Sequence, residues 1–252
     1  MANFEHWCDF KYWTVGGHDL HEVTADPSKT TLAISNVASA VPHAYVAPTR
    51  LAQMLQILGK KRAAAYLADK LPESKELRSG DLGEILCTYY VSQQTDYKQG
   101  IWRLRWKDTR TMSMRGEDVL GFALTKSNKL RVLKAESKSR KSMTSAVIGE
   151  AREALCANGG LPSPHAMAFV ADRLDELGDT TLSAAIVNAT LKTTLKPSQV
   201  KHLLFSFSEN DPSQMLVNSL GTYAGPCKQL YVRLQVAQHQ NFIKSVFAAV
   251  SM

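Results

Sequence analysis

The chain has 252 residues, of which 44% are hydrophobic and 21% charged, a balance typical of a globular protein and not of a disordered one. Its 30 Lys and Arg residues against 23 Asp and Glu residues give a net charge of +7, and basic proteins of this size often bind nucleic acid. No apolar run approaches the ~20 residues that span a bilayer, and the N-terminus does not resemble a signal peptide. We therefore expect a cytoplasmic protein with no membrane partner.

The N-terminal part of the chain is predicted to form an arm in which helices dominate. Residues 1–47 are expected to be irregular, with a strand-like start and a β-rich patch at 30–37. Three helices are expected next: from Pro48 to Gly59, over 62–70, and from a cap at 79–81 to about Ser92.

The middle of the chain is predicted to form β-structure. Residues 101–106 alternate apolar and basic side chains, which is typical of a strand, and 111–115 continue it as a hairpin. A short buried strand is expected at 119–124 and a longer strand of mixed character at 130–138, with a turn at 127–128 between them.

The rest of the chain alternates helices and strands. We expect helices at about 142–157, 164–177 and 182–192, strands at 202–207 and 229–236, and a closing helix at 238–250. This order predicts a single α/β domain over 1–252, with a central mixed sheet flanked by helices. Its expected parts are the N-terminal arm over about 1–75, a core over about 76–210, and a C-terminal strand and helix over about 211–252.

The positive charge is concentrated in one segment. Residues 97–141 hold thirteen basic and four acidic side chains, a balance of +9, so the remainder of the chain carries −2. A surface that faces phosphates would have this composition, and so would a solvated set of strand faces and turns.

Three acids and a lysine are the best candidates for a chemical site. Glu136 and Lys138 are one residue apart on a predicted strand, so their side chains share a face, and Asp118 begins the strand before it. Two carboxylates that lie close together repel each other unless a divalent cation lies between them. Glu84, on the third predicted helix, is the natural third acid, although its place on the helix also fits a glutamate that faces solvent.

The order of these residues resembles the core of the PD-(D/E)xK nucleases, which combine a helix glutamate, a strand aspartate and an E-x-K strand. The resemblance covers roughly residues 80–157, and Glu117 stands where the superfamily name has proline. The segments G-E-I-L at 83–86, G-x-D at 116–118 and A-E-S-K at 135–138 also resemble the HamA family, the nuclease subunits of the Hachiman anti-phage defence system.

The resemblance implies a restriction-endonuclease-like core and a metal-dependent DNA nuclease with little sequence specificity. Asp118 and Glu136 would hold Mg²⁺ or Mn²⁺, Glu84 would complete the site, and Lys138 would serve the attacking water. The family also implies an ATP-dependent helicase as the partner subunit.

The expected phosphate contacts come from basic residues on and around the E-x-K strand, namely Arg115, Lys134, Arg140 and Lys141. Two other functions are compatible with the same residues. One is a non-catalytic adaptor that binds DNA or a helicase and whose acids form structural ion pairs. The other is a stand-alone restriction-type endonuclease.

Overall fold

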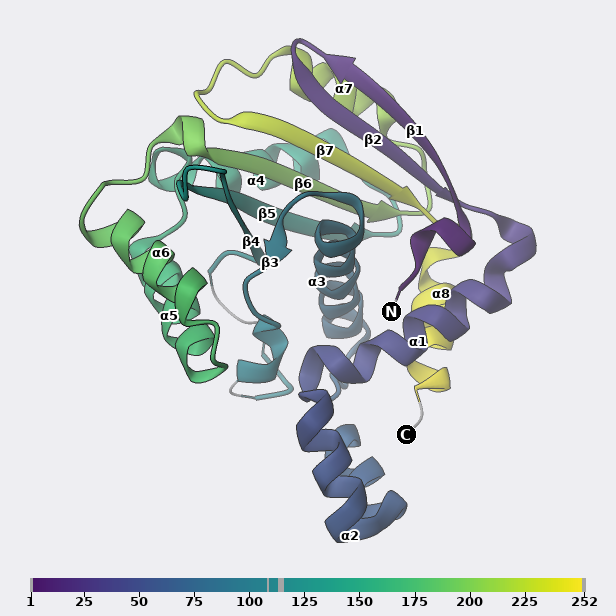
Figure 1. Cartoon of the computed structure of the whole chain (residues 1–252). Coiled ribbons are helices and arrows are strands. Elements are labelled where there is room, and N and C mark those ends of the chain that lie inside the picture. Colours follow the sequence, from purple (N-terminus) through teal and green to yellow (C-terminus); the bar gives the residue numbers. More distant parts are fainter. Residues whose placement is uncertain (1, 108, 113–115, 251–252) are drawn as a thin grey trace.

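The computed structural model describes residues 2–107, 109–112 and 116–250, and within these ranges seven strands form one mixed sheet in the order β1-β2-β7-β6-β5-β4-β3 (Figure 1). The strands are β1 (Cys8–Val15), β2 (His18–Ala25), β3 (Lys98–Gln99), β4 (Val119–Leu124), β5 (Leu130–Arg140), β6 (Val200–Ser208) and β7 (Lys228–Gln235). The four central strands run parallel, whereas β1 on one side and β4 and β3 on the other are antiparallel to their neighbours. The α/β fold with a central mixed sheet is thereby confirmed.

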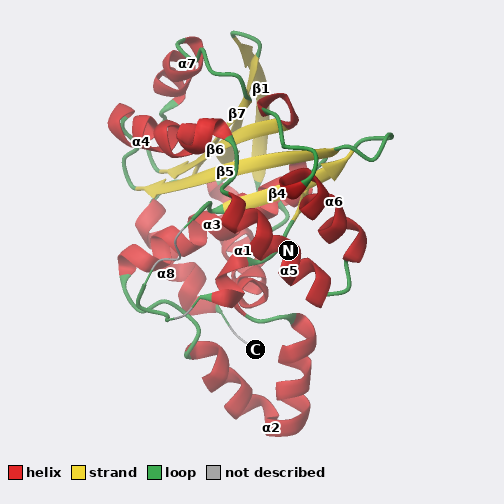
Figure 2. Cartoon of the chain, turned by 90° about the vertical axis from the view of Figure 1, so that its left-hand side faces the viewer, coloured by secondary structure: helices red, strands yellow, loops and turns green. Residues whose placement is uncertain are grey.

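Helices cover both faces of this sheet (Figure 2). They are α1 (Thr30–Tyr45), α2 (Pro48–Ala68), α3 (Lys75–Gln94), α4 (Ser145–Cys156), α5 (Pro164–Glu176), α6 (Thr180–Leu191), α7 (Ser213–Gly221) and α8 (His239–Ala249). Short 3₁₀ helices are η1 (Phe4–His6), η2 (Pro27–Lys29), η3 (Arg103–Trp106), η4 (Ala157–Gly160) and η5 (Pro197–Gln199). No helix within the described residues is long and apolar enough to cross a membrane.

The alternation of side chains along the strands divides the core between the two faces. Helices α1, α3 and α8 pack with one set of strand residues, which includes Leu133, Phe205 and Val232. The opposite face packs against α4 and α7 around Leu204, and against α5 and α6 around Val132. Since β5 and β6 lie inside the sheet and are covered on both sides, polar residues on them are held in fixed positions.

The N-terminal region differs from the predicted irregular segment. Strands β1 and β2 form a hairpin that joins the sheet beside β7. The predicted β-rich patch at 30–37 was wrong, because this stretch is the first half of α1. Its β-branched residues favour a strand locally, but Ala33, Val37 and Val41 recur at helical spacing and are buried, and tertiary packing outweighs local propensity.

The two predicted arm helices are present as the halves of α2. Gly59 interrupts them with φ 73° and ψ 168°, a conformation that glycine adopts readily. The arm projects away from the sheet (Figure 1), and of its residues only Ala63 and Leu67 are buried.

The third helix begins earlier than predicted. Ser74 is the N-cap of α3, and its side chain accepts a hydrogen bond from the backbone N–H of Leu77 at 3.2 Å. Residues 79–81, which were predicted to form the cap, lie inside the helix and make tertiary contacts instead. Asp81 accepts a hydrogen bond from the hydroxyl of Tyr45 at 2.7 Å.

The strand predicted at 101–106 was wrong, and this stretch contains η3. Its basic side chains do not alternate across a sheet: Arg103 donates to Glu84, and Arg105 donates to the backbone carbonyl of His43. Residues 113–115 of the predicted hairpin lie outside the described part of the chain. The strands predicted at 119–124 and 130–138, and all the later helices and strands, are present to within a few residues, whereas α7 was not predicted.

Candidate active site

The register of β4 and β5 brings Asp118 next to the E-x-K strand. Val119 pairs with Ala135 in this antiparallel ladder, so Asp118, just before β4, is level with Glu136. The Oδ2 atom of Asp118 accepts a hydrogen bond from the backbone N–H of Ser137 at 2.8 Å. The aspartate is therefore fixed at the end of its strand beside the glutamate.

Lys138 lies beside Glu136 on β5, as the period of the strand requires. Its Nζ atom is 2.8 Å from Oε1 of Glu136, and the two side chains are 20% and 16% exposed. The ammonium group is thus held next to a carboxylate while part of it is open to solvent.

Glu84 reaches the site from α3, which packs closely on β5. A Cβ atom added to Gly83 would lie 3.0 Å from Oγ of Ser137 and 3.1 Å from Cβ of Ser139, so a glycine permits this close approach. The helix is buried on all sides from Asp81 to Val91, and Glu84 is only 8% exposed. The interpretation of Glu84 as a solvent-facing helix residue is therefore wrong.

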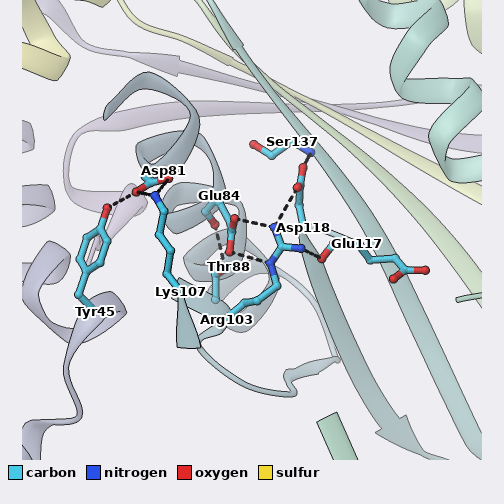
Figure 3. A network of polar contacts seen from close by, with 9 residues as sticks. All are labelled: Tyr45, Asp81, Glu84, Thr88, Arg103, Lys107, Glu117, Asp118 and Ser137. Atoms are coloured by element: carbon cyan, nitrogen blue, oxygen red, sulfur yellow. Dashed lines mark hydrogen bonds and ion pairs between the residues drawn. The ribbon is translucent and has the colours of Figure 1, made fainter. Parts of the chain in front are cut away.

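Arg103 of η3 lies between Glu84 and Asp118 (Figure 3). Its Nη2 atom is 3.1 Å from Oε2 of Glu84 and 3.3 Å from Oδ1 of Asp118, and its Nε atom is 3.4 Å from Oε1 of Glu84. Its Nη1 atom also donates to the backbone carbonyl of Glu117. One guanidinium thus bridges two of the three predicted acids.

Glu84 and Asp118 have higher pKa values than isolated carboxyl groups. Burial raises the pKa of Glu84 to about 7, against the opposing charge of Arg103. Burial, and then the negative charge of Glu136, raise the pKa of Asp118 as well. Burial disfavours the charged form of Arg103, but the three carboxylates outweigh it and its pKa is raised. Burial therefore disfavours the charged forms of Glu84 and Asp118, and a cation between them offsets part of this cost.

A second buried ion pair lies one helical turn from Glu84. Nζ of Lys107 is 2.8 Å from Oδ2 of Asp81 and 3.1 Å from Oδ1 (Figure 3). Arg105 lies between Arg103 and Lys107 in the sequence. Its Nε and Nη2 atoms donate hydrogen bonds to the backbone carbonyl of His43, at 3.0 and 2.7 Å. Together these contacts fix η3 and the residue after it to α3 and α1.

The carboxylates of Asp118, Glu136 and Glu84 have the donor chemistry that Mg²⁺ prefers. In the described part of the chain, however, no three His, Cys, Asp or Glu side chains are arranged to hold a metal ion as they stand. Glu84 and Asp118 are instead joined by the guanidinium of Arg103. Because a cationic side chain already lies between these two acids, the position suits positive charge.

The basic residues that were predicted to contact phosphate differ in their exposure to solvent. Lys134 is only 3% exposed, and its Nζ atom donates to the carbonyls of Leu155, Ala157 and Leu161 at 3.1–3.2 Å. Its assignment to DNA binding was therefore wrong, because it caps the end of α4 instead. Arg115 lies outside the described residues, whereas Arg140 and Lys141 are exposed where β5 ends.

Several other cations of the basic segment are also engaged within the protein. Arg110 pairs with Asp69 and Glu73, and Arg131 pairs with Asp96 at 3.0 Å. The concentration of basic residues in 97–141 is thus explained in part by ion pairs at the surface and by the buried partners of Arg103, Lys107 and Lys134, and less of it is available to phosphate than the composition indicates.

A cavity of about 540 Å³ opens beside Asp118. Arg103, Glu117 and Asp118 form its polar side, and Trp106 and Phe169 contribute aromatic rings that meet edge to face, with centroids 6.3 Å apart. Glu117 closes one end, because its carboxylate accepts hydrogen bonds from the backbone N–H and the hydroxyl of Ser163.

Sequence reasoning missed Arg103, Asp81 and Lys107 as parts of this site. A signal for them was present, because α3 carries two acids three residues apart and the basic residues at 103 and 107 are available as partners. The strand predicted at 101–106 placed these basic residues on an exposed face, so their pairing with the acids of α3 was not predicted.

Two comparisons with known proteins agree with each other. A family model described as HamA matches residues 1–250 of the chain. The Hachiman protein HamA of Bacillus cereus is 28% identical over 227 residues, which cover 88% of this chain and 80% of that protein.

Proposed function

Since the chain belongs to the HamA family, we propose that it is a metal-dependent DNA nuclease with a PD-(D/E)xK-type site that acts in anti-phage defence. The observation that carries this proposal is the placement of Asp118 level with Glu136, with Lys138 paired to Glu136 on the same strand. Glu84, joined to Asp118 through Arg103, adds the third carboxylate.

The residues present fit a divalent cation. Asp118 and Glu136 would hold Mg²⁺ or Mn²⁺, with Glu84 as a further ligand, because hard cations prefer carboxylate oxygens. When bound, the cation would polarise the phosphate and lower the pKa of a bound water. Because the acids already attract a guanidinium, the chemistry of the site favours a positive charge.

The protein's own groups have separate roles in this proposal. Lys138 places an ammonium beside Glu136, where it can hydrogen-bond the attacking water and stabilise the charge that develops on the phosphate. The Ser137 N–H orients Asp118 by a hydrogen bond to one of its two oxygens. Both strands are anchored inside the sheet, so these groups are held in place before the substrate arrives.

DNA would be held through its backbone. Arg140 and Lys141 are exposed and lie just beyond Lys138 at the end of β5, so a phosphate at the site is within the range of their charge. Backbone contacts carry no sequence information, so this mode of binding gives little sequence specificity.

We also propose that an ATP-dependent helicase is the partner subunit. The projecting arm α2 supports this, because Leu55, Ile57 and Leu58 are 39%, 75% and 40% exposed on it. The arm carries four basic residues and no acidic ones, so the matching surface would be an apolar groove with acidic residues around it. A stand-alone endonuclease would have no need for such an exposed apolar arm.

A non-catalytic adaptor is the second candidate, because the ion pairs of Arg103 and Lys138 could be purely structural. Plasmid cleavage by the purified chain together with the helicase subunit, in Mg²⁺ and in EDTA, separates the two functions. We expect cleavage that needs Mg²⁺ and that falls at least about a hundredfold in Glu136→Ala, which removes a metal ligand.

The matched control for this test is Glu150→Ala, which removes an exposed glutamate of α4 that is not part of the acidic cluster. It should cleave as the wild type does. If Glu136→Ala is folded and cleaves DNA at the wild-type rate, the nuclease proposal fails and the adaptor function replaces it.

A further inference from the structure

We propose that Arg103 competes with the divalent cation for Glu84 and Asp118, so that the cation binds fully only when this guanidinium withdraws. The inference rests on the proposed function and adds to it a mode of regulation at the same site. No feature of the sequence motif indicates such a role, because Arg103 lies outside the helix and strands that carry the acids.

The contacts of Arg103 are those of a bound cation. Its guanidinium lies within 3.4 Å of both oxygens of Glu84 and within 3.3 Å of Oδ1 of Asp118 (Figure 3). The three side chains are 13%, 11% and 23% exposed, so these ion pairs are largely shielded from water. The oxygens that face Arg103 are therefore not free to ligate a metal in this arrangement.

The electrostatics of the site explain why Arg103 and a divalent cation would exclude each other. Glu84 and Asp118 contact the same cation, and two carboxylates that share a site repel each other as anions unless a positive charge lies between them. Arg103 supplies one positive charge and Mg²⁺ supplies two, and both need the same oxygen atoms. Occupation by one therefore opposes occupation by the other.

The backbone of η3 is held by contacts that do not involve the acids of the site, so it can stay in place when the Arg103 guanidinium gives up its contacts with Glu84, Asp118 and the Glu117 carbonyl. Arg105 donates a hydrogen bond to the carbonyl of His43, and Lys107 forms an ion pair with Asp81. These two contacts anchor η3 and do not involve Glu84, Asp118 or Glu136. The cavity of about 540 Å³ is lined by Arg103 itself, so it provides the space into which the guanidinium would withdraw.

The consequence is a nuclease whose metal site is weak at rest. A protein that cuts DNA with little sequence preference is harmful to its own cell unless its activity is restrained. A restraint inside the site acts before DNA binds, and any event that draws Arg103 into the cavity, such as DNA or partner binding, would relieve it.

Mn²⁺ binding to the whole chain, measured by isothermal titration calorimetry without DNA, tests this inference independently of activity. Arg103→Gln should bind Mn²⁺ at least about tenfold more tightly than the wild type, because the competing charge is removed from a shielded pair. Arg131→Gln is the matched control. It removes an arginine that pairs with the exposed Asp96 and makes no contact with the acids of the site, and the affinity should stay that of the wild type.

Arg103→Lys keeps the positive charge but loses the fork that bridges two carboxylates, so its affinity should lie between those of the wild type and Arg103→Gln. This variant also provides the test if Arg103→Gln does not fold. Equal or weaker Mn²⁺ binding by the folded variants overturns the competition and leaves the nuclease proposal intact. Absence of Mn²⁺ binding in the wild type and in every variant overturns the metal site, and both proposals fail with it.

Discussion

The cations near the acidic cluster fall into two groups that composition alone does not separate. Arg103, Lys107 and Lys134 are used inside the protein, where each satisfies carboxylates or carbonyl groups that would otherwise be buried without a partner. Arg140 and Lys141 are exposed at the end of the E-x-K strand. Affinity for DNA should therefore depend on the second group.

Replacing the exposed pair tests this division. Arg140→Ala combined with Lys141→Ala should weaken DNA binding and reduce the slope of log affinity against log salt by about one unit for each phosphate that the variant no longer binds. Fluorescence anisotropy with a labelled duplex at several salt concentrations measures both effects.

The matched control removes Lys126 and Lys129, exposed on the turn at the opposite end of β5. Lys126→Ala with Lys129→Ala should leave the slope nearly unchanged. Equal effects of the two double variants would show that DNA is bound by diffuse charge and not at the proposed site.

At the scale of secondary-structure elements, the contact between α3 and β5 determines where Glu84 lies. Gly83 allows this contact, since an added Cβ would meet Ser137 and Ser139 at 3.0–3.1 Å. Gly83→Ala should push the helix away from the strand, lower the free energy of unfolding by about 1–3 kcal/mol and reduce nuclease activity. Chemical denaturation and the plasmid assay measure the two effects.

Gly80 provides the comparison for Gly83, because it is on the same helix and a Cβ there would meet nothing within 4 Å. Gly80→Ala should leave activity unchanged and raise the free energy of unfolding by up to about 1 kcal/mol, since alanine favours the helix. If Gly83→Ala is as stable and as active as Gly80→Ala, the close packing does not position Glu84.

The arm α2 is the element that we expect to bind the helicase subunit. Ile57→Asp places a charge on its most exposed apolar residue and should abolish co-purification with that subunit. Leu191→Asp makes the same kind of change on α6, where Leu191 is 82% exposed, and should leave co-purification intact. Equal recovery of the helicase with both variants would exclude the arm as its binding surface.

At the scale of the whole molecule, the sequence predicts the parts of the fold whose periodicity agrees with their burial. The strands β4, β5, β6 and β7 and the later helices have clear patterns, and their positions were predicted to within a few residues. α1 was misread because its β-branched residues favour a strand locally, while the face that it buries is set by distant parts of the chain.

The candidate site was predictable to a similar degree. The strand period alone places Glu136 and Lys138 on one face, and the strand order places Asp118 near them. Arg103 was not assigned, because the strand predicted at 101–106 excluded a contact of this segment with α3, about twenty residues earlier in the chain. Lys134 was misassigned for a related reason, since the carbonyls that it caps lie at the end of the next helix and just beyond it.

The central claim is that Asp118 and Glu136 form a divalent-cation site together with Lys138 and Glu84. The most direct test is anomalous X-ray diffraction from crystals of the wild type and of Arg103→Gln grown at the same Mn²⁺ concentration, chosen below saturation of the wild type. The account predicts a Mn²⁺ peak within ligand distance of Asp118 and Glu136 that is stronger in the variant. A Mn²⁺ peak elsewhere, or none at these acids in either crystal, would contradict it.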